Sequence, residues 1–277
     1  MELEPSCKMW CRPVRLLSAC CGHIGVDIGL LEGGGIRGEL RRVPSMCFVI
    51  EHPEGLVVWD TSMHPCVCTD PVGYWGDLAT TVTVPDFAEN ETLLARLEEA
   101  GIDAADIRFV INSHLHNDHC GMNRFFPKAT VLARRSEYEH AKGLMDTGKH
   151  GYVRGDFFGD DQTLEFVEYD DTLDLFSDGA LVLISTVGHT PGHQSLQVTF
   201  PSGRRFVMTG DALYTSEQLE ARRPPGLTFD RKEAQTSADR LADLGDEGAT
   251  ILIHHEPSLW EMRPAVSLLW EEGTPAS

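Results

Sequence analysis

Four side chains of the kinds that bind metals lie within six residues of one another, in the order His-x-His-x-Asp-His. They are His114, His116, Asp118 and His119. Groups packed this closely would repel one another and lose hydration unless they shared a cation. The spacing therefore predicts a metal site, and a chance cluster of ordinary histidines is the less favoured interpretation.

The residues before this cluster predict how it is positioned. The run from Ile107 to Ile111 is short, apolar and rich in β-branched residues, which is typical of a buried strand. The four side chains would then follow the carboxyl end of that strand. In α/β folds this edge of the sheet is where functional sites are built.

The same pattern recurs along the chain. Other apolar, strand-like runs end in Asp60, in His189, in Asp211 and in the pair His254–His255. Strand ends that meet at one edge would gather these side chains around the first cluster, which predicts a dinuclear metal centre. Two interpretations of Asp60 stay open: it caps a turn, or it is a hydrogen-bond partner of a metal-bound histidine.

Hydrophobic periodicity predicts the elements that support these ends. Strands are predicted over 14–21, 47–50, 56–59, 129–133, 167–169, 181–184, 205–208 and 250–253. Helices are predicted after caps at Asn90 and Asp230, over 135–144 and around 266–270. Long loops are predicted over 62–89 and 146–162. The aromatic residues of the first loop indicate a wall or lid for an apolar substrate.

The overall composition argues against several classes of function. The 277 residues carry a net charge of −20, so we expect neither nucleic acid nor an anionic membrane as a partner. No segment approaches the ~20 apolar residues that span a bilayer, and the N-terminus lacks a signal-peptide pattern. We therefore expect a cytoplasmic protein with a small-molecule substrate, whose eight cysteines are mostly reduced. A homodimer stays an open alternative to a monomer.

Residues 1–13 are predicted to form an arm, followed by a single domain over 14–277. Within that domain, Gly33 to Gly38 fits the pattern G-x-G-x-x-G of dinucleotide-binding loops. Pro44 stops a helix from following, so we predict a flexible loop at this position and no nucleotide site.

Together these motifs resemble those of the metallo-β-lactamase superfamily. The residues that carry the resemblance are the 114–119 cluster, Gly188–His189, Gly210–Asp211 and the late His255. The resemblance covers nearly the whole chain. It implies an α/β fold, the αβ/βα four-layer sandwich, with two central mixed β-sheets and helices outside.

Within the superfamily the chain is most similar to the N-acyl-homoserine lactone lactonases, which are quorum-quenching enzymes. The stretches 188–196 and 210–215 look like theirs, as does the ending from His255 to Trp260. The resemblance implies a metal-dependent hydrolase that opens a lactone ring by attack of a metal-bridging hydroxide. The alternative is a hydrolase of the same fold that acts on another lactone, ester, thioester or amide, with a natural-product or vitamin-derived substrate.

The resemblance also implies the residues of the site. One metal would be held by His114, His116 and His189, the other by Asp118, His119 and His255, with Asp211 bridging both. Tyr214 would donate a hydrogen bond to the substrate carbonyl, and Asp118 would carry a proton to the leaving alkoxide. His254 competes with His255 as the last ligand, and His255 is preferred because it directly precedes an acidic residue. His193 is expected to support the ligands.

Two divalent ions are expected as cofactors, with Zn²⁺ preferred and Fe, Mn or Co as alternatives. Two other classes of function compete with hydrolysis. A non-catalytic metal-binding protein would have no need of both Asp211 and Tyr214. A redox enzyme would need an electron source, and no flavin or second-cofactor motif is visible in the sequence.

Overall fold

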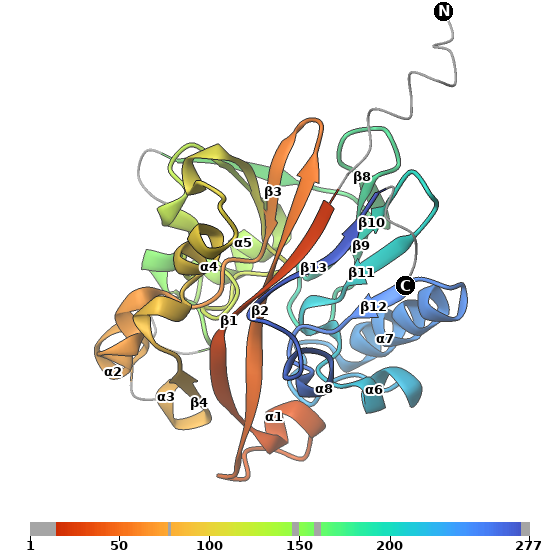
Figure 1. Cartoon of the computed structure of the whole chain (residues 1–277). Helices are drawn as coiled ribbons and strands as arrows, with labels where there is room; N and C mark the ends of the chain where they lie inside the picture. Colours follow the sequence, from red (N-terminus) through yellow and green to blue (C-terminus); the bar gives the residue numbers. More distant parts are fainter. Residues whose placement is uncertain (1–14, 77–78, 146–149, 158–161, 273–277) are drawn as a thin grey trace, which may run out of the picture.

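Two β-sheets face each other in this protein, and helices cover their outer faces (Figure 1). The computed structural model describes residues 15–76, 79–145, 150–157 and 162–272. The αβ/βα sandwich predicted from the sequence is confirmed. The predicted arm over 1–13 lies outside the described residues.

The first sheet has eight strands, in the order β13-β1-β2-β3-β5-β6-β7 with β4 paired to β1. They are β1 (Arg15–Asp27), β2 (Leu40–His52), β3 (Gly55–Trp59), β4 (Thr83–Asp86), β5 (Ile107–Ile111), β6 (Thr130–Arg134), β7 (Thr163–Val167) and β13 (Val266–Glu271). Strands β3, β5, β6 and β7 are parallel, so their carboxyl ends share one edge. Asp60 and the 114–119 cluster leave β3 and β5 at that edge.

The second sheet has five strands, in the order β12-β11-β10-β9-β8. They are β8 (Thr172–Asp174), β9 (Leu181–Ser185), β10 (Gln194–Thr199), β11 (Arg205–Met208) and β12 (Thr250–Leu252). Because β10 is antiparallel to both β9 and β11, and β11 is parallel to β12, three strands end at the same edge. The segments that carry His189, Asp211 and His255 begin there.

Strand β2 shows why the first sheet is covered on both faces. Met46, Phe48 and Ile50 belong to the core between the two sheets, whereas Cys47 and Val49 belong to the core on the opposite face. Successive side chains of a strand point to opposite faces, so a stretch that is apolar at every position, as 46–50 is, needs both faces buried.

Eight short helices complete the described part of the fold. They are α1 (Ile28–Glu32), α2 (Pro71–Trp75), α3 (Ala79–Val82), α4 (Leu93–Glu99), α5 (Arg135–Lys142), α6 (Ser216–Glu220), α7 (Arg231–Asp246) and α8 (Pro257–Trp260). Helices α4 and α5 lie on the first sheet, and α7 lies on the second (Figure 1). Helix α7 starts as predicted, because the Asp230 side chain accepts from the amides of Lys232 and Glu233. None of the described helices is long and apolar enough to cross a bilayer.

Four local predictions were wrong. Helix α4 is capped by Thr92 and not by Asn90. Residues 62–89 contain α2, α3 and β4 and not one long loop. The strand expected over 167–169 lies earlier, at β7. Residues 266–270 form strand β13 and not a helix, because pairing with β1 decides the conformation of this short apolar run.

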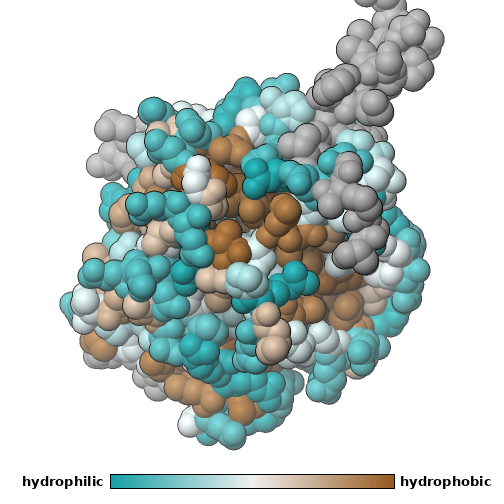
Figure 2. All heavy atoms as spheres, viewed as in Figure 1, coloured by the Kyte–Doolittle hydropathy of each residue, from teal (hydrophilic) through white to brown (hydrophobic). Residues whose placement is uncertain are grey.

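The surface is mostly polar, with apolar side chains at particular places. On the face drawn in Figure 2, they gather near the centre, where β13 runs in Figure 1. Leu268 of β13 is 50% exposed. Two other exposed apolar side chains, Ile36 and Phe229, lie at the cavity described next.

Candidate metal centre

The histidines and carboxylates predicted from separate segments meet at the shared edge of the two sheets. One group of ligand atoms, all within 4.8 Å of one another, comes from His114, His116, His189 and Asp211. A second group comes from His119, His254 and His255. Asp211 joins the two groups, because its Oδ2 lies 3.5 Å from His189 Nε2 and its Oδ1 lies 3.0 Å from His119 Nε2.

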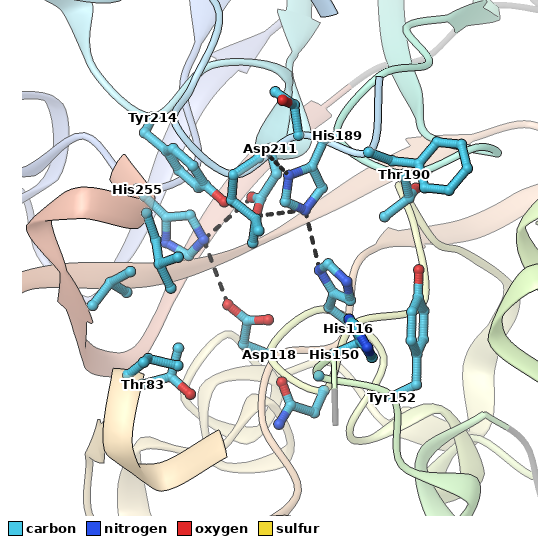
Figure 3. Close-up of a pocket in the computed structure, with 18 of the residues that line it drawn as sticks. Thr83, His116, Asp118, His150, Tyr152, His189, Thr190, Asp211, Tyr214 and His255 are labelled. Carbon is cyan, nitrogen blue, oxygen red and sulfur yellow. Dashed lines mark hydrogen bonds and ion pairs between the residues drawn. The ribbon is translucent and has the colours of Figure 1, made fainter. Parts of the chain in front are cut away.

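Asp118 borders the second group from the side of the cavity. Its Oδ2 lies 3.6 Å from His255 Nε2 and 3.7 Å from His119 Nε2. Figure 3 shows Asp118 and His116 on one side of the site and His189, Asp211, Tyr214 and His255 on the other, pointing into one space. The elements that carry these two sides belong to the two different sheets.

Two histidines are oriented by hydrogen bonds on the side away from the centre. His189 Nδ1 lies 3.0 Å from the carbonyl oxygen of Leu227, and His255 Nδ1 lies 2.8 Å from that of Pro44. A carbonyl oxygen can only accept, so Nδ1 carries the proton in each ring. Each Nε2 therefore turns a lone pair toward the centre, which is the arrangement of a metal-binding histidine.

Asp60 orients two further histidines from beneath the site. Its Oδ2 lies 2.9 Å from His119 Nδ1 and accepts from Ser113 Oγ at 2.8 Å. The same Ser113 hydroxyl lies 3.0 Å from His114 Nδ1. Asp60 has a φ of 56°, an unfavourable conformation for a residue with a side chain, which these bonds hold in place. Asp60 is thus a hydrogen-bond partner of a histidine and not a simple turn residue.

The inward-facing atoms fit a metal centre. His119 Nε2 and Asp211 Oδ1 lie 3.0 Å apart, and both are buried without a hydrogen-bond partner. Because His119 Nδ1 donates to Asp60, Nε2 and Asp211 Oδ1 would face each other as two acceptors unless a proton or a metal ion lay between them. Imidazole and carboxylate groups together are a donor set suited to divalent transition metals.

The surroundings also set the protonation of these groups. Burial lowers the pKa of the His114 and His116 imidazoles well below the ordinary value, and neighbouring histidines lower it further. Burial raises the pKa of Asp211, but His119 and His255 outweigh that effect and hold it well below its ordinary value. Burial lowers the pKa of His119 and His255 as well, but the Asp211 and Asp118 carboxylates outweigh that effect and raise it above the ordinary value. Neutral imidazoles and an ionised carboxylate are the forms that bind metals, so His114, His116 and Asp211 are already in that form, whereas a metal ion would displace a proton from His119 and His255.

Two further buried histidines support the site from behind. His193 Nε2 accepts from the amide of Asp211 at 3.0 Å, and His254 Nε2 accepts from the amide of Met46 at 3.0 Å. The Nε2 lone pair of His254 is therefore already used. His255 Nε2 instead lies 3.3 Å from Asp211 Oδ1, so the geometry favours His255 as the inward-facing histidine of this pair.

The centre lies at the floor of a cavity of about 640 Å³ (Figure 3). Its apolar wall consists of Val26, Leu30, Ile36, Val82, Leu227 and Phe229. Tyr214 also lines the cavity, and its hydroxyl donates to Asp211 Oδ2 at 2.9 Å. Burial and the adjacent Asp211 carboxylate raise the pKa of Tyr214 well above its ordinary value, so the hydroxyl keeps its proton.

Residues 77–247 match the family model of the metallo-β-lactamase superfamily. The chain belongs to this superfamily. Superfamily membership and the two groups of inward-facing ligand atoms together indicate divalent metal ions as cofactors.

Characterised members of the superfamily are similar over most of the chain. The N-acyl homoserine lactonase AttM of Azorhizobium caulinodans is 34% identical, over 84% of this chain and 89% of that protein. AttM of Rhizobium radiobacter is 35% identical over the same shares. A solved N-acyl homoserine lactone hydrolase, with N-hexanoyl-L-homoserine bound at its catalytic metal center, has a TM-score of 0.79 at 25% identity. That match covers 91% of this chain and 97% of the solved one.

The sequence predicted that residues 62–89 form the apolar wall of the cavity, but the structure builds this wall mainly from other segments. Of the residues in 62–89 that the structure describes, Val82 and Thr83 alone line the cavity. Trp75 is buried in a core cluster, and Tyr74 donates a hydrogen bond to Asp156. The wall comes mainly from α1, the glycine-rich loop and the segment before α7. Phe229 was not predicted from the sequence; the one signal for it was an aromatic residue directly before the helix cap Asp230.

Proposed function

We propose that this protein is a dinuclear metal-dependent hydrolase that opens the ring of N-acyl homoserine lactones. The observation that carries the proposal is that Asp211 joins two groups of inward-facing histidines at the floor of a cavity with one apolar wall. The similarity to characterised lactonases supports the choice of substrate.

The proposed ligands of one ion are His114, His116 and His189, and those of the other are Asp118, His119 and His255, with Asp211 shared. Zn²⁺ is the proposed ion at both positions, because tetrahedral imidazole and carboxylate sites suit it. Two such ions would supply a water of lowered pKa and a positive charge beside the substrate carbonyl. What supports two ions is that the possible ligand atoms form two groups and not one, and that the second group keeps His119 and His255 after His254 is excluded.

Tyr214 is the proposed donor to the lactone carbonyl oxygen. Its hydroxyl is at the floor of the cavity, and its raised pKa keeps the proton that such a donor needs. When the carbonyl carbon is attacked, negative charge develops on this oxygen, and a hydrogen bond placed there stabilises the transition state more than the substrate.

Asp118 is the proposed proton carrier. Its side chain is 13% exposed, whereas that of Asp211 is 4% exposed, so Asp118 is the carboxylate more open to the cavity. It can accept a proton on the carboxylate oxygen that does not bind the ion as a water adds to the carbonyl carbon, and return that proton to the ring oxygen as the carbon–oxygen bond breaks.

The apolar wall is the proposed contact surface for the acyl chain. A homoserine lactone carries its acyl chain and its ring on opposite sides of one amide, which matches a cavity with an apolar wall and a polar floor. We further propose that the enzyme is a single domain over 14–277 that acts on this small molecule in the cytoplasm. Its net charge of −20 argues against nucleic acid as a partner.

The test is hydrolysis of a series of N-acyl homoserine lactones by protein whose metal content has been measured. Two ions per chain and ring opening that stops with a chelator and returns with zinc are the expected results. Two ions without turnover of any member of the series would contradict the substrate, and γ-lactones, phenyl esters and thioesters would then be assayed. Light scattering on the same samples would decide between monomer and homodimer.

A further inference from the structure

Glu137 is a buried carboxylate that lies behind the candidate metal centre. It is the third residue of α5, and it is only 1% exposed. A glutamate at this helix position commonly reaches back to the amide of the residue that precedes the helix. The hydrogen bonds of Glu137 go instead to two loops that carry proposed metal ligands.

One oxygen of Glu137 holds the first loop. Its Oε1 accepts from the amide of Leu115 at 3.1 Å, and Leu115 lies between His114 and His116 in the chain. The same oxygen accepts from the hydroxyl of Tyr152 at 3.1 Å. The Tyr152 ring lies against His116 with 4.7 Å between ring centroids. One carboxylate oxygen therefore holds both the backbone of this ligand loop and the tyrosine ring that lies against His116.

The other oxygen holds the second loop. Its Oε2 accepts from the amide of Gly192 at 3.1 Å, three residues after His189. Gly192 approaches α5 so closely that a Cβ atom there would lie 2.3 Å from the Glu137 amide nitrogen. Only glycine allows this approach, so the chain is built to bring the His189 loop onto this carboxylate.

We infer that Glu137 is a positioning residue that fixes the His114–His116 loop relative to the His189 loop, and so stabilises one of the two metal sites selectively. A carboxylate offers two acceptor oxygens to these loops, whereas a glutamine amide offers one oxygen and an NH₂ group that cannot accept. The histidines of the other site are held elsewhere, His255 by Pro44. The inference rests on the ligand set proposed above.

The decisive experiment measures zinc binding to Glu137→Gln in steps, by competition with a chromophoric chelator on metal-free protein. Supporting contacts of this kind change metal affinity by about 10- to 100-fold, so we expect that fall for one ion and less than about twofold for the other. The matched control is Glu139→Gln, an exposed glutamate two residues further along the same helix. It should bind both ions as the wild type does.

Two readouts separate positioning from a general loss of structure. The cobalt-substituted Glu137→Gln variant should lose or shift the visible absorption of one ion and keep that of the other. Unchanged affinities, or an equal loss at both sites together with a lower melting temperature of the metal-free protein, would overturn the inference. A wild type that binds fewer than two ions would refute the proposed dinuclear centre itself, which is a different failure.

A second variant keeps the inference testable if Glu137→Gln does not fold. Tyr152→Phe removes only the hydroxyl donor and leaves both amide contacts to Glu137 in place. We expect a smaller fall in affinity at the same single site, with the other site unchanged. Wild-type affinity for both ions in this variant would overturn the inference.

Discussion

The Nδ1 atom of His119 lies 2.9 Å from the Oδ2 atom of Asp60, and both side chains are completely buried. Burial raises the pKa of the Asp60 carboxyl, and its contacts with His119 and Ser113 oppose that effect. A buried acceptor at this position fixes the His119 proton on Nδ1 and leaves Nε2 free for a metal.

Asp60→Asn should weaken metal binding. The amide removes one of the two acceptor oxygens that Ser113 and His119 share, so the zinc affinity should fall by about 10- to 100-fold, as supporting contacts generally do. Chelator competition measures it. Asp86→Asn, which alters an exposed ion pair with Arg42, is the control and should bind zinc normally. Equal affinities in both variants would remove Asp60 from the metal site.

Asp211→Ala should lose metal and activity together. This carboxylate lies against the inward-facing Nε2 atoms of histidines in both ligand groups, so its removal leaves neither site complete. Elemental analysis of the purified variant should find well under two ions per chain, and lactone hydrolysis should be absent. Full metal content in this variant would exclude a shared role for Asp211.

Tyr214→Phe should keep the metal and lose rate. Removing one hydrogen-bond donor to a developing oxyanion generally costs about 10²- to 10³-fold in kcat. Metal content and melting temperature, measured on the same preparation, should match the wild type because the ring remains. Wild-type kcat for a homoserine lactone would show that the hydroxyl plays no part in the reaction.

Phe229→Ala should change the preference for acyl-chain length. The ring is 63% exposed at the apolar wall, so it can be removed without opening the core. For a decanoyl substrate kcat/KM should fall about tenfold, the effect of roughly two methylene contacts at about 0.8 kcal/mol each. For a butanoyl substrate kcat/KM should be unchanged, because the shorter chain does not reach the wall. Leu268→Ala, exposed on β13 and not among the cavity residues, is the control.

Asp156→Asn should remove a pH-dependent loss of stability. Burial raises the pKa of Asp156 well above 3.8, although Tyr74 and Arg124 oppose it. Above the unfolded pKa of about 3.9 the unfolded chain releases this proton while the folded chain keeps it, so the free energy of unfolding falls as pH rises from the unfolded pKa to the folded pKa and levels off above it. Urea titrations from pH 4 to 8 should show the variant gaining stability over the wild type as pH rises. A constant difference would contradict the raised pKa.

The sequence alone determined the chemistry of the site and the class of fold. His114, His116, Asp118 and His119 are close in the chain, so their spacing is visible without a structure. The ends of the strands that precede Asp60, Asp211 and His255 could be predicted because buried strands are short apolar runs with clear ends. Local spacing and hydrophobic pattern carry this information in the sequence itself.

Only the tertiary structure decided how those residues are held and what surrounds them. Glu137 gives no signal in the sequence, because its partners Leu115 and Gly192 lie 22 and 55 positions away and use their backbone amides. His255 is chosen over His254 because the His254 ring already accepts a hydrogen bond from the amide of Met46, which lies more than 200 residues earlier in the chain. Strand β13 likewise follows from its pairing with β1. Contacts between distant segments are set by packing of the whole chain, which local pattern does not encode.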